Sequence, residues 1–143
     1  MRKELLICVL CAGMAACSGG RPGAAAEDKQ MKKDVVEVLY FHGAQRCATC
    51  VAIEKGVREL CETSYAESLK SGKLRFRSVD INKEEALAEK YEVTWSSLIL
   101  ADYDDSGKER AANLTEFAFG TARTAPERFK AGLSERITEM LNN

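Results

Sequence analysis

Residues 35–61 read VVEVLYFHGAQRCATCVAIEKGVRELC, and they contain the clearest structural pattern in the chain. The first part, 35–41, is β-branched and aromatic, which predicts a buried strand. A loop at 42–46 follows. A helix is predicted to begin near Cys47 and to run into the sixties, because apolar residues recur there on one helical face. These residues are Cys50, Ile53, Val57, Leu60 and Cys61.

The residues after this helix predict further strands and a short helix. Apolar and charged residues alternate at 73–79, which predicts a strand with one face in water. A short helix is expected at 83–91 and a third strand at 97–103, closed by the turn residues Asp-Asp-Ser-Gly. A weak strand is expected at 109–114.

The last helix has the clearest start. Residues 124–127 (TAPE) fit a capping box with a proline in the first turn. Apolar residues then recur every four positions, at Phe129, Leu133, Ile137 and Leu141. The whole order of strands and helices predicts one α/β domain at 34–143, with a central mixed sheet flanked by helices. Its first two strands should run parallel across a helical crossover.

The N-terminus predicts export. Arg2 and Lys3 form a basic head, and the apolar stretch at 5–16 is too short to span a bilayer. Small residues and Cys17 follow, which is the order of a secretory signal peptide. We therefore expect residues 1–16 to be a signal peptide.

Residues 14–17 (MAAC) also resemble the bacterial lipobox, whose cysteine is lipidated and becomes the new N-terminus. Met14 departs from the leucine that is usual there. The resemblance implies a lipid anchor at Cys17 and a flexible tether at 17–33. Ordinary cleavage and an uncleaved anchor are the alternatives.

Composition and cysteine count limit the function further. The 21 Lys and Arg residues nearly balance 22 Asp and Glu without a long run of one sign, so nothing indicates a nucleic-acid partner. Cleavage would remove Cys8 and Cys11, and Cys17 would carry lipid. Three cysteines would remain as thiols: Cys47, Cys50 and Cys61. Three is an odd number, which favours one pair and one leftover thiol over a scaffold of several disulfides.

The C-x-x-C motif formed by Cys47 and Cys50 lies at the start of the predicted helix, just after the predicted strand and its loop. The unpaired N–H groups and the positive end of the helix dipole favour a thiolate at Cys47, the predicted nucleophile. Arg46 adds a positive charge beside it. Cys50 lies one turn into the helix on its apolar face, where it should resolve a mixed disulfide. Metal binding and an inert structural pair are the other interpretations, although a zinc site would need a second ligand pair.

The order of elements and the placement of this motif resemble the thioredoxin superfamily. Residues 79–82 (VDIN) resemble the end of the second core strand of that superfamily, and residues 88–93 (AEKYEV) resemble its A-x-x-Y-x-V segment. The resemblance covers about 34–141. It implies a thioredoxin-like domain that does thiol–disulfide chemistry.

Three departures from the superfamily stand out. Ser96 or Ser97 takes the place of its cis-proline, so we expect trans peptide bonds and an altered substrate groove at 95–97. Tyr40 or Phe41 takes the place of its buried acid. Residues 48–49 (AT) match neither its reducing nor its strongly oxidising members, so redox direction cannot be carried over.

Four other residues have competing interpretations. Glu54 could accept the proton of Cys50, but an edge residue paired with Arg58 is the favoured interpretation. His42 could stabilise the thiolate, although a solvated loop histidine is favoured. Cys61 is expected to be a buried core residue, since it lies far beyond disulfide reach. Trp95 could contact substrate or belong to the core.

Together these observations predict a membrane-tethered thiol–disulfide oxidoreductase of the bacterial cell envelope, with its domain facing the periplasm or the cell exterior. Its partners would be protein thiols or disulfides and a membrane electron donor, which would make it a reductase. No cofactor or metal ion is expected. Two alternatives stay open. One is a binding module that captures a client or a soft metal ion through the C-x-x-C motif without turnover, and the other is a structural lipoprotein with a passive disulfide.

Overall fold

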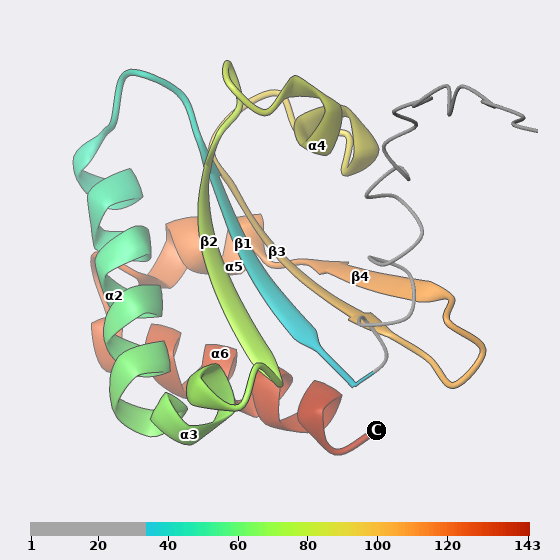
Figure 1. Ribbon diagram of the computed structural model, residues 1–143. Helices are drawn as coiled ribbons and strands as arrows, with labels where there is room; N and C mark the ends of the chain where they lie inside the picture. The colour runs from blue at the N-terminus through green and yellow to red at the C-terminus, as the bar shows by residue number, and fades with distance from the viewer. Residues whose placement is uncertain (1–33) are drawn as a thin grey trace, which may run out of the picture.

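The computed structural model describes residues 34–143 (Figure 1). The predicted signal peptide, the lipidation site at Cys17 and the tether lie outside the described residues. The elements, in chain order, are β1 (Val36–His42), α2 (Ala48–Ser64), α3 (Ala66–Lys70), β2 (Leu74–Asp80), α4 (Glu85–Lys90), β3 (Ser97–Tyr103), β4 (Glu109–Asn113), α5 (Thr115–Thr121) and α6 (Pro126–Leu141).

The four strands of the described region form one mixed sheet in the order β2-β1-β3-β4. β1 pairs with β2 in parallel, across the crossover made by α2 and α3, as the sequence predicted. β1 pairs with β3, and β3 with β4, in antiparallel fashion. The loop after β1 therefore leaves the sheet at its centre and leads directly into α2.

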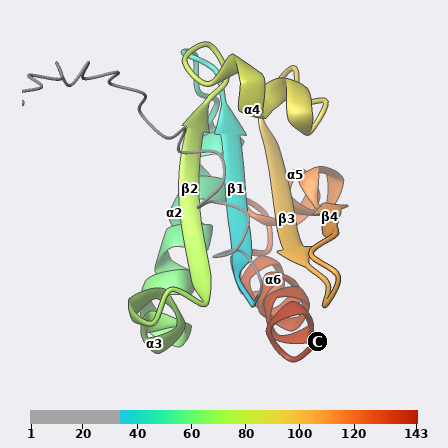
Figure 2. The same ribbon diagram turned by 45° about the vertical axis from the view of Figure 1, so that its right-hand side comes forward.

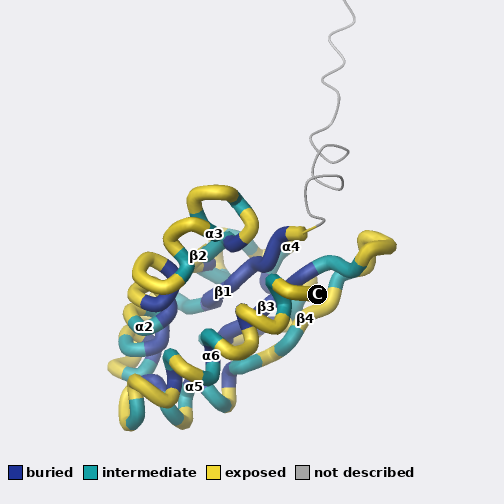
Figure 3. The backbone as a smooth tube through the Cα atoms, turned by 90° about the horizontal axis from the view of Figure 1, so that it is seen from below, coloured by how far each residue is buried: buried dark blue, intermediate teal, exposed yellow. Residues whose placement is uncertain are grey.

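Helices cover both faces of the sheet (Figures 1 and 2). Val38 and Tyr40 of β1 face the larger core, which α2, α5 and α6 complete. Leu39 and Phe41 face the smaller core under α4. Because both faces of β1 are buried, its sequence is an almost continuous apolar run. Figure 3 shows this burial along β1 and on the inner side of α2.

Close packing between α2 and α6 depends on a glycine. A Cβ atom at Gly56 of α2 would lie 2.9 Å from Cε1 of Phe129 on α6. Real side chains essentially never approach so closely. The absence of a side chain at this position lets the Phe129 ring lie directly against the α2 backbone, beneath the helix that carries the C-x-x-C motif.

The predicted capping box of the last helix does not form. The Thr124 hydroxyl donates to the carbonyl of Gly120 at 3.0 Å, so it closes the end of α5 instead. Ala125 is the N-cap residue of α6, and no side chain caps it. Pro126 does open the helix, as predicted. Phe129, Leu133 and Ile137 are buried, and Leu141 is half-buried.

Two short helices, α3 and α5, were not predicted. They have 5 and 7 residues, too few for an apolar period to repeat. The predicted strands and the other helices agree with the structure within one or two residues at either end. Within residues 34–143, no helix has the length and apolar character needed to cross a membrane.

Candidate functional site

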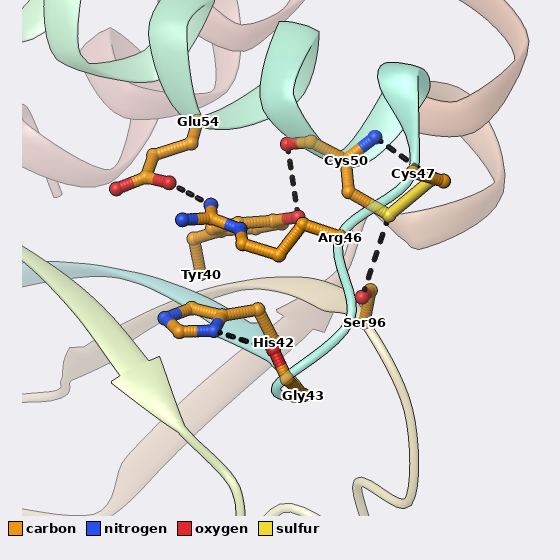
Figure 4. Close-up of a disulfide and its surroundings, with 8 residues drawn as sticks. All are labelled: Tyr40, His42, Gly43, Arg46, Cys47, Cys50, Glu54 and Ser96. Atoms are coloured by element: carbon orange, nitrogen blue, oxygen red, sulfur yellow. Dashed lines mark hydrogen bonds and ion pairs between the residues drawn. A yellow bond between two sulfur atoms is a disulfide. The ribbon is translucent and has the colours of Figure 1, made fainter.

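Cys47 and Cys50 form a disulfide at the start of α2 (Figure 4). Cys47 is the N-cap residue of this helix, and its Sγ accepts a hydrogen bond from the backbone N–H of Cys50 at 3.1 Å. Cys47 is exposed, whereas Cys50 is only 5% exposed. An incoming thiol or disulfide can therefore reach the first sulfur far more easily than the second.

The helix places positive electrostatic potential at this pair. The first turn of α2 contains no acidic residue that would offset the positive end of its dipole. The N–H group that points at Cys47 Sγ would also stabilise a thiolate there after reduction. Both effects favour Cys47 as the more nucleophilic of the two cysteines.

Arg46 is not directed at the sulfurs. Its side chain runs away from the disulfide, and its guanidinium lies over the ring of Tyr40 at 5.8 Å from the ring centroid (Figure 4). It forms an ion pair with Glu54. The charge next to Cys47 in the sequence is thus partly neutralised by a carboxylate one to two turns along α2.

Glu54 has the surroundings of a paired edge residue. Besides Arg46, it pairs with Arg58 at 3.2 Å, the i,i+4 contact expected from the sequence. Figure 4 shows its carboxylate turned toward the guanidinium of Arg46, on the far side of Arg46 from the sulfurs. The geometry supports the ion-pair interpretation over that of a proton acceptor beneath the cysteines.

Tyr40 occupies the place where the superfamily resemblance led us to expect a buried acid. Its ring is fully buried, and its hydroxyl donates to the carbonyl of Cys50 at 3.0 Å. Burial raises the pKa of Tyr40, and interactions with Arg46 and Ser96 oppose that rise. The hydroxyl therefore remains protonated at neutral pH, and it anchors the first turn of α2 to the centre of the sheet.

Ser96 lies against the disulfide from the loop that precedes β3. Its Oγ is 3.6 Å from Sγ of Cys50. The peptide bonds from Trp95 to Leu98 are trans, as predicted for a chain without proline at this point. A hydroxyl group thus occupies the position facing the buried sulfur.

Trp95 and Ser97, the neighbours of Ser96, have opposite environments. Trp95 is 58% exposed and packs against Phe119 of α5 with ring centroids 5.3 Å apart, so the core interpretation is wrong. Ser97 is buried as the first residue of β3, and its hydroxyl donates to the carbonyl of Trp95 at 3.1 Å. Ser97 therefore does not line a groove at the surface, contrary to the prediction.

His42 and Cys61 lie apart from the disulfide. The imidazole of His42 turns away from the sulfurs, and its Nδ1 donates to the carbonyl of Gly43 at 3.1 Å (Figure 4). Cys61 is a free thiol buried in the larger core, as predicted. Burial, with a smaller contribution from Glu62, raises the pKa of Cys61 to about 11. In residues 34–143, no group of three or more His, Cys, Asp or Glu residues is arranged to hold a metal ion.

Sequence reasoning missed two features of the site. The hydroxyl of Tyr40 was not expected to bind Cys50, although its position had been matched to that of a buried acid. Val51, next to Cys50, is 52% exposed, and together with Trp95 it places apolar surface near the disulfide. The exposure of Val51 could have been foreseen, since it lies off the apolar face of the helix.

Of three comparisons with known proteins, the one with solved structures finds similar chains. No protein-family model matches the chain, and no curated protein matches it. The chain is similar to the solved structure of Fasciola hepatica thioredoxin, at 22% identity over 80% of this chain and 88% of that chain, with a TM-score of 0.49. It is also similar to Trxlp from Edwardsiella tarda EIB202, at 18% identity over 78% of this chain and 93% of that chain, with a TM-score of 0.48. The likeness to ERdj5 form I has 12% identity over 74% of this chain and 13% of that chain, with a TM-score of 0.50.

The C-x-x-C motif at the start of α2 is consistent with thiol–disulfide redox chemistry. At these identities, the likenesses to solved structures concern the fold alone. The chain has an α/β fold, in which a mixed four-stranded sheet is flanked by helices and the C-x-x-C motif opens the helix after the first described strand. The solved structures that it is similar to include thioredoxins.

Proposed function

We propose that this protein is a membrane-tethered thiol–disulfide oxidoreductase that acts as a reductase outside the cytoplasm. The observation that carries the proposal is the asymmetry of the pair, with Cys47 exposed at the N-cap of α2 and Cys50 buried one turn further on. This arrangement suits a two-step exchange, in which one thiolate attacks a client disulfide and the second thiol resolves the adduct.

In the reducing direction, the Cys47 thiolate attacks one sulfur of a client disulfide, and the other client sulfur leaves as a thiolate. Cys50 then attacks Cys47 Sγ, which forms the Cys47–Cys50 disulfide and releases the second client thiol. The client gains two electrons and two protons, and the protein becomes oxidised. A donor dithiol must reduce the pair again before the next cycle.

The clients we propose are protein disulfides. Trp95 and Val51 are the large hydrophobic side chains that stand exposed in the described part of the chain. Trp95 adjoins Ser96, which touches Cys50, and Val51 follows Cys50 directly, so both lie near the reacting sulfurs. An exposed indole beside a reactive pair is typical of a surface that contacts another protein.

The location is part of the proposal and is supported by the sequence of residues 1–17. A lipid at Cys17 would hold the domain at a membrane surface, and the tether would raise its effective concentration near a membrane electron donor. A Cys17→Ala variant should be released from the membrane fraction. The intact mass of the wild-type protein after detergent extraction should show a lipidated cysteine as its first residue, and an unmodified N-terminus would contradict the anchor.

A redox titration of the full-length protein tests the chemistry. Trypsin cuts after Arg46 and Lys55, so one peptide, 47–55, contains both reactive cysteines and excludes the remaining four. Its dithiol and disulfide forms should interconvert in one two-electron transition, and the protein should reduce insulin with dithiothreitol as donor. A matched Cys47→Ser variant should do neither.

Three outcomes would contradict all or part of this proposal. Protein that isolates with a stoichiometric soft metal ion and shows no turnover would favour the binding module. A pair that never cycles would favour a passive disulfide. A midpoint potential well above that of glutathione would contradict the reducing direction while leaving the exchange chemistry in place.

A further inference from the structure

Cys50, the buried cysteine, has to become a thiolate in the second step, and its burial opposes this. Cys50 is 5% exposed, and burial disfavours a charged sulfur. Tyr40 occupies the place expected for a buried acid, and Glu54 is engaged with Arg46 and Arg58. Some other group must stabilise the charge on this sulfur during resolution.

The polar side chain that contacts the sulfur of Cys50 is Ser96, whose Oγ lies 3.6 Å from it (Figure 4). In the disulfide, Sγ of Cys50 has no proton, so the hydroxyl is the group that can donate. The two residues are 46 positions apart in the chain. The contact therefore depends on the fold and does not arise from local helix geometry.

Tyr40 holds Cys50, the residue that Ser96 contacts, in place. Its hydroxyl donates to the carbonyl of Cys50 at 3.0 Å. The Tyr40 ring is fully buried in the centre of the sheet, so this anchor cannot move without disturbing the core. One hydroxyl thus fixes the backbone of Cys50 while the other faces its sulfur.

We propose that Ser96 is a catalytic residue that stabilises the Cys50 thiolate by hydrogen-bond donation during resolution, an inference that rests on the proposed redox function. Cys50 loses its proton, its sulfur attacks Cys47 Sγ, and the bond between Cys47 and the client sulfur breaks. The proton lost by Cys50 is balanced by the one that the departing client thiolate takes up, with water carrying it between them. The products are the Cys47–Cys50 disulfide and a client thiol.

The neighbouring serine provides a matched control. The hydroxyl of Ser97 donates to the carbonyl of Trp95, and Ser97 is buried at the start of β3. Ser96→Ala and Ser97→Ala remove the same group from adjacent residues, but only the first removes a donor to sulfur. Ser96→Thr keeps the hydroxyl and should behave like the wild type.

A rapid chemical quench experiment separates formation of the adduct from its resolution. The reduced full-length protein reacts with glutathione disulfide, and the reaction is stopped at successive short times. Mass spectrometry of peptide 47–55 then follows the dithiol, the glutathione adduct and the internal disulfide. A hydrogen bond to a charged group changes the thiolate population by roughly tenfold. The more basic thiolate that results regains about threefold in nucleophilicity. For Ser96→Ala we therefore expect resolution about threefold slower at pH 7, with formation of the adduct unchanged.

The pH profile distinguishes this role from a structural one. The midpoint of the resolution step in Ser96→Ala should move upward by about one pH unit, and above both midpoints the variant should be no slower than the wild type. Equal midpoints in wild type and Ser96→Ala would overturn the proposed role of Ser96, and so would an equal upward shift in Ser97→Ala. Neither result would affect the proposed redox function. A wild-type peptide that never acquires glutathione would overturn the proposed function as well.

Discussion

Arg46 forms an ion pair with Glu54, so the positive charge nearest to Cys47 in the sequence is directed along α2 and away from the disulfide. The guanidinium also lies over the ring of Tyr40, whose hydroxyl donates to the Cys50 carbonyl. This cluster ties the loop before α2 to the helix and to the sheet. It suggests that Arg46 acts mainly on the position of the pair and less on its charge.

The first prediction concerns Glu54. Glu54→Gln removes one negative charge and leaves the charge of Arg46 less compensated, so alkylation of Cys47 should reach half its maximal rate at a pH lower by roughly 0.5. Resolution by Cys50 should keep its wild-type rate, because the carboxylate faces the two arginines. Alkylation and resolution are both measured by quenching the reaction of the full-length protein and following peptide 47–55 by mass spectrometry.

Glu59→Gln supplies the control for this change. It makes the same chemical substitution further along α2, at an exposed residue that pairs with Lys130 and lies outside the cluster. It should leave both steps unchanged. Resolution slowed tenfold or more in Glu54→Gln alone would restore Glu54 as the proton acceptor for Cys50.

The second prediction assigns the roles of the two cysteines. Cys50→Ser should leave a stable mixed disulfide between Cys47 and a client, because the resolving thiol is missing. Cys47→Ser should trap far less, since Cys50 is buried. Non-reducing gels of cells that express each variant, followed by mapping of the linked peptides, provide the measurement. Equal trapping by both variants would mean that Cys50 is as accessible to clients as Cys47.

The sequence predicted the strands and the long helices well because their apolar residues are periodic or continuous over whole elements. It could not predict α3 and α5, whose few residues carry no period. The capping box at residues 124–127 failed for a different reason. The Thr124 hydroxyl had a competing acceptor, the carbonyl of Gly120, and only the arrangement of α5 brings that acceptor within reach.

The site was predictable only in part, for a related physical reason. The C-x-x-C motif is local, and its place at a helix start followed from its neighbours. The contacts of Tyr40 and Ser96 with Cys50 span 10 and 46 residues, so they exist only once the sheet has assembled. The charge of Arg46 was foreseen correctly, but its direction depends on Glu54 and the Tyr40 ring.

The third prediction uses the buried thiol of Cys61. Its pKa is raised to about 11 in the folded protein, whereas an unfolded chain would lose the same proton near pH 9. Between these values the unfolded state binds fewer protons, so the free energy of unfolding must fall as pH rises. The loss amounts to about 2 kcal/mol, and it is absent below pH 8.

Cys61→Ala isolates this contribution. Denaturant titrations from pH 8 to 11 should show a shallower loss of stability in the variant, and the other raised pKa values, such as that of Tyr91, are common to both proteins. Redox turnover at pH 7 should be unchanged. Identical slopes for the two proteins would contradict the buried-thiol assignment, and lost turnover in a folded variant would make Cys61 a working residue.

The last prediction concerns the exposed indole of Trp95. Trp95→Ala should slow the reduction of a protein disulfide such as insulin by about tenfold, the usual effect of removing an aromatic contact at an interface. The reaction with glutathione disulfide should hardly change, because a small substrate needs access to Cys47 and little more. Trp95→Phe should retain most of the activity toward insulin, since the ring can still pack against Phe119. The thermal unfolding midpoint should stay close to that of the wild type, given that the side chain is 58% exposed. A parallel loss toward both substrates would instead show that Trp95 supports the geometry of the Ser96 loop, and the proposed client surface would have to lie elsewhere.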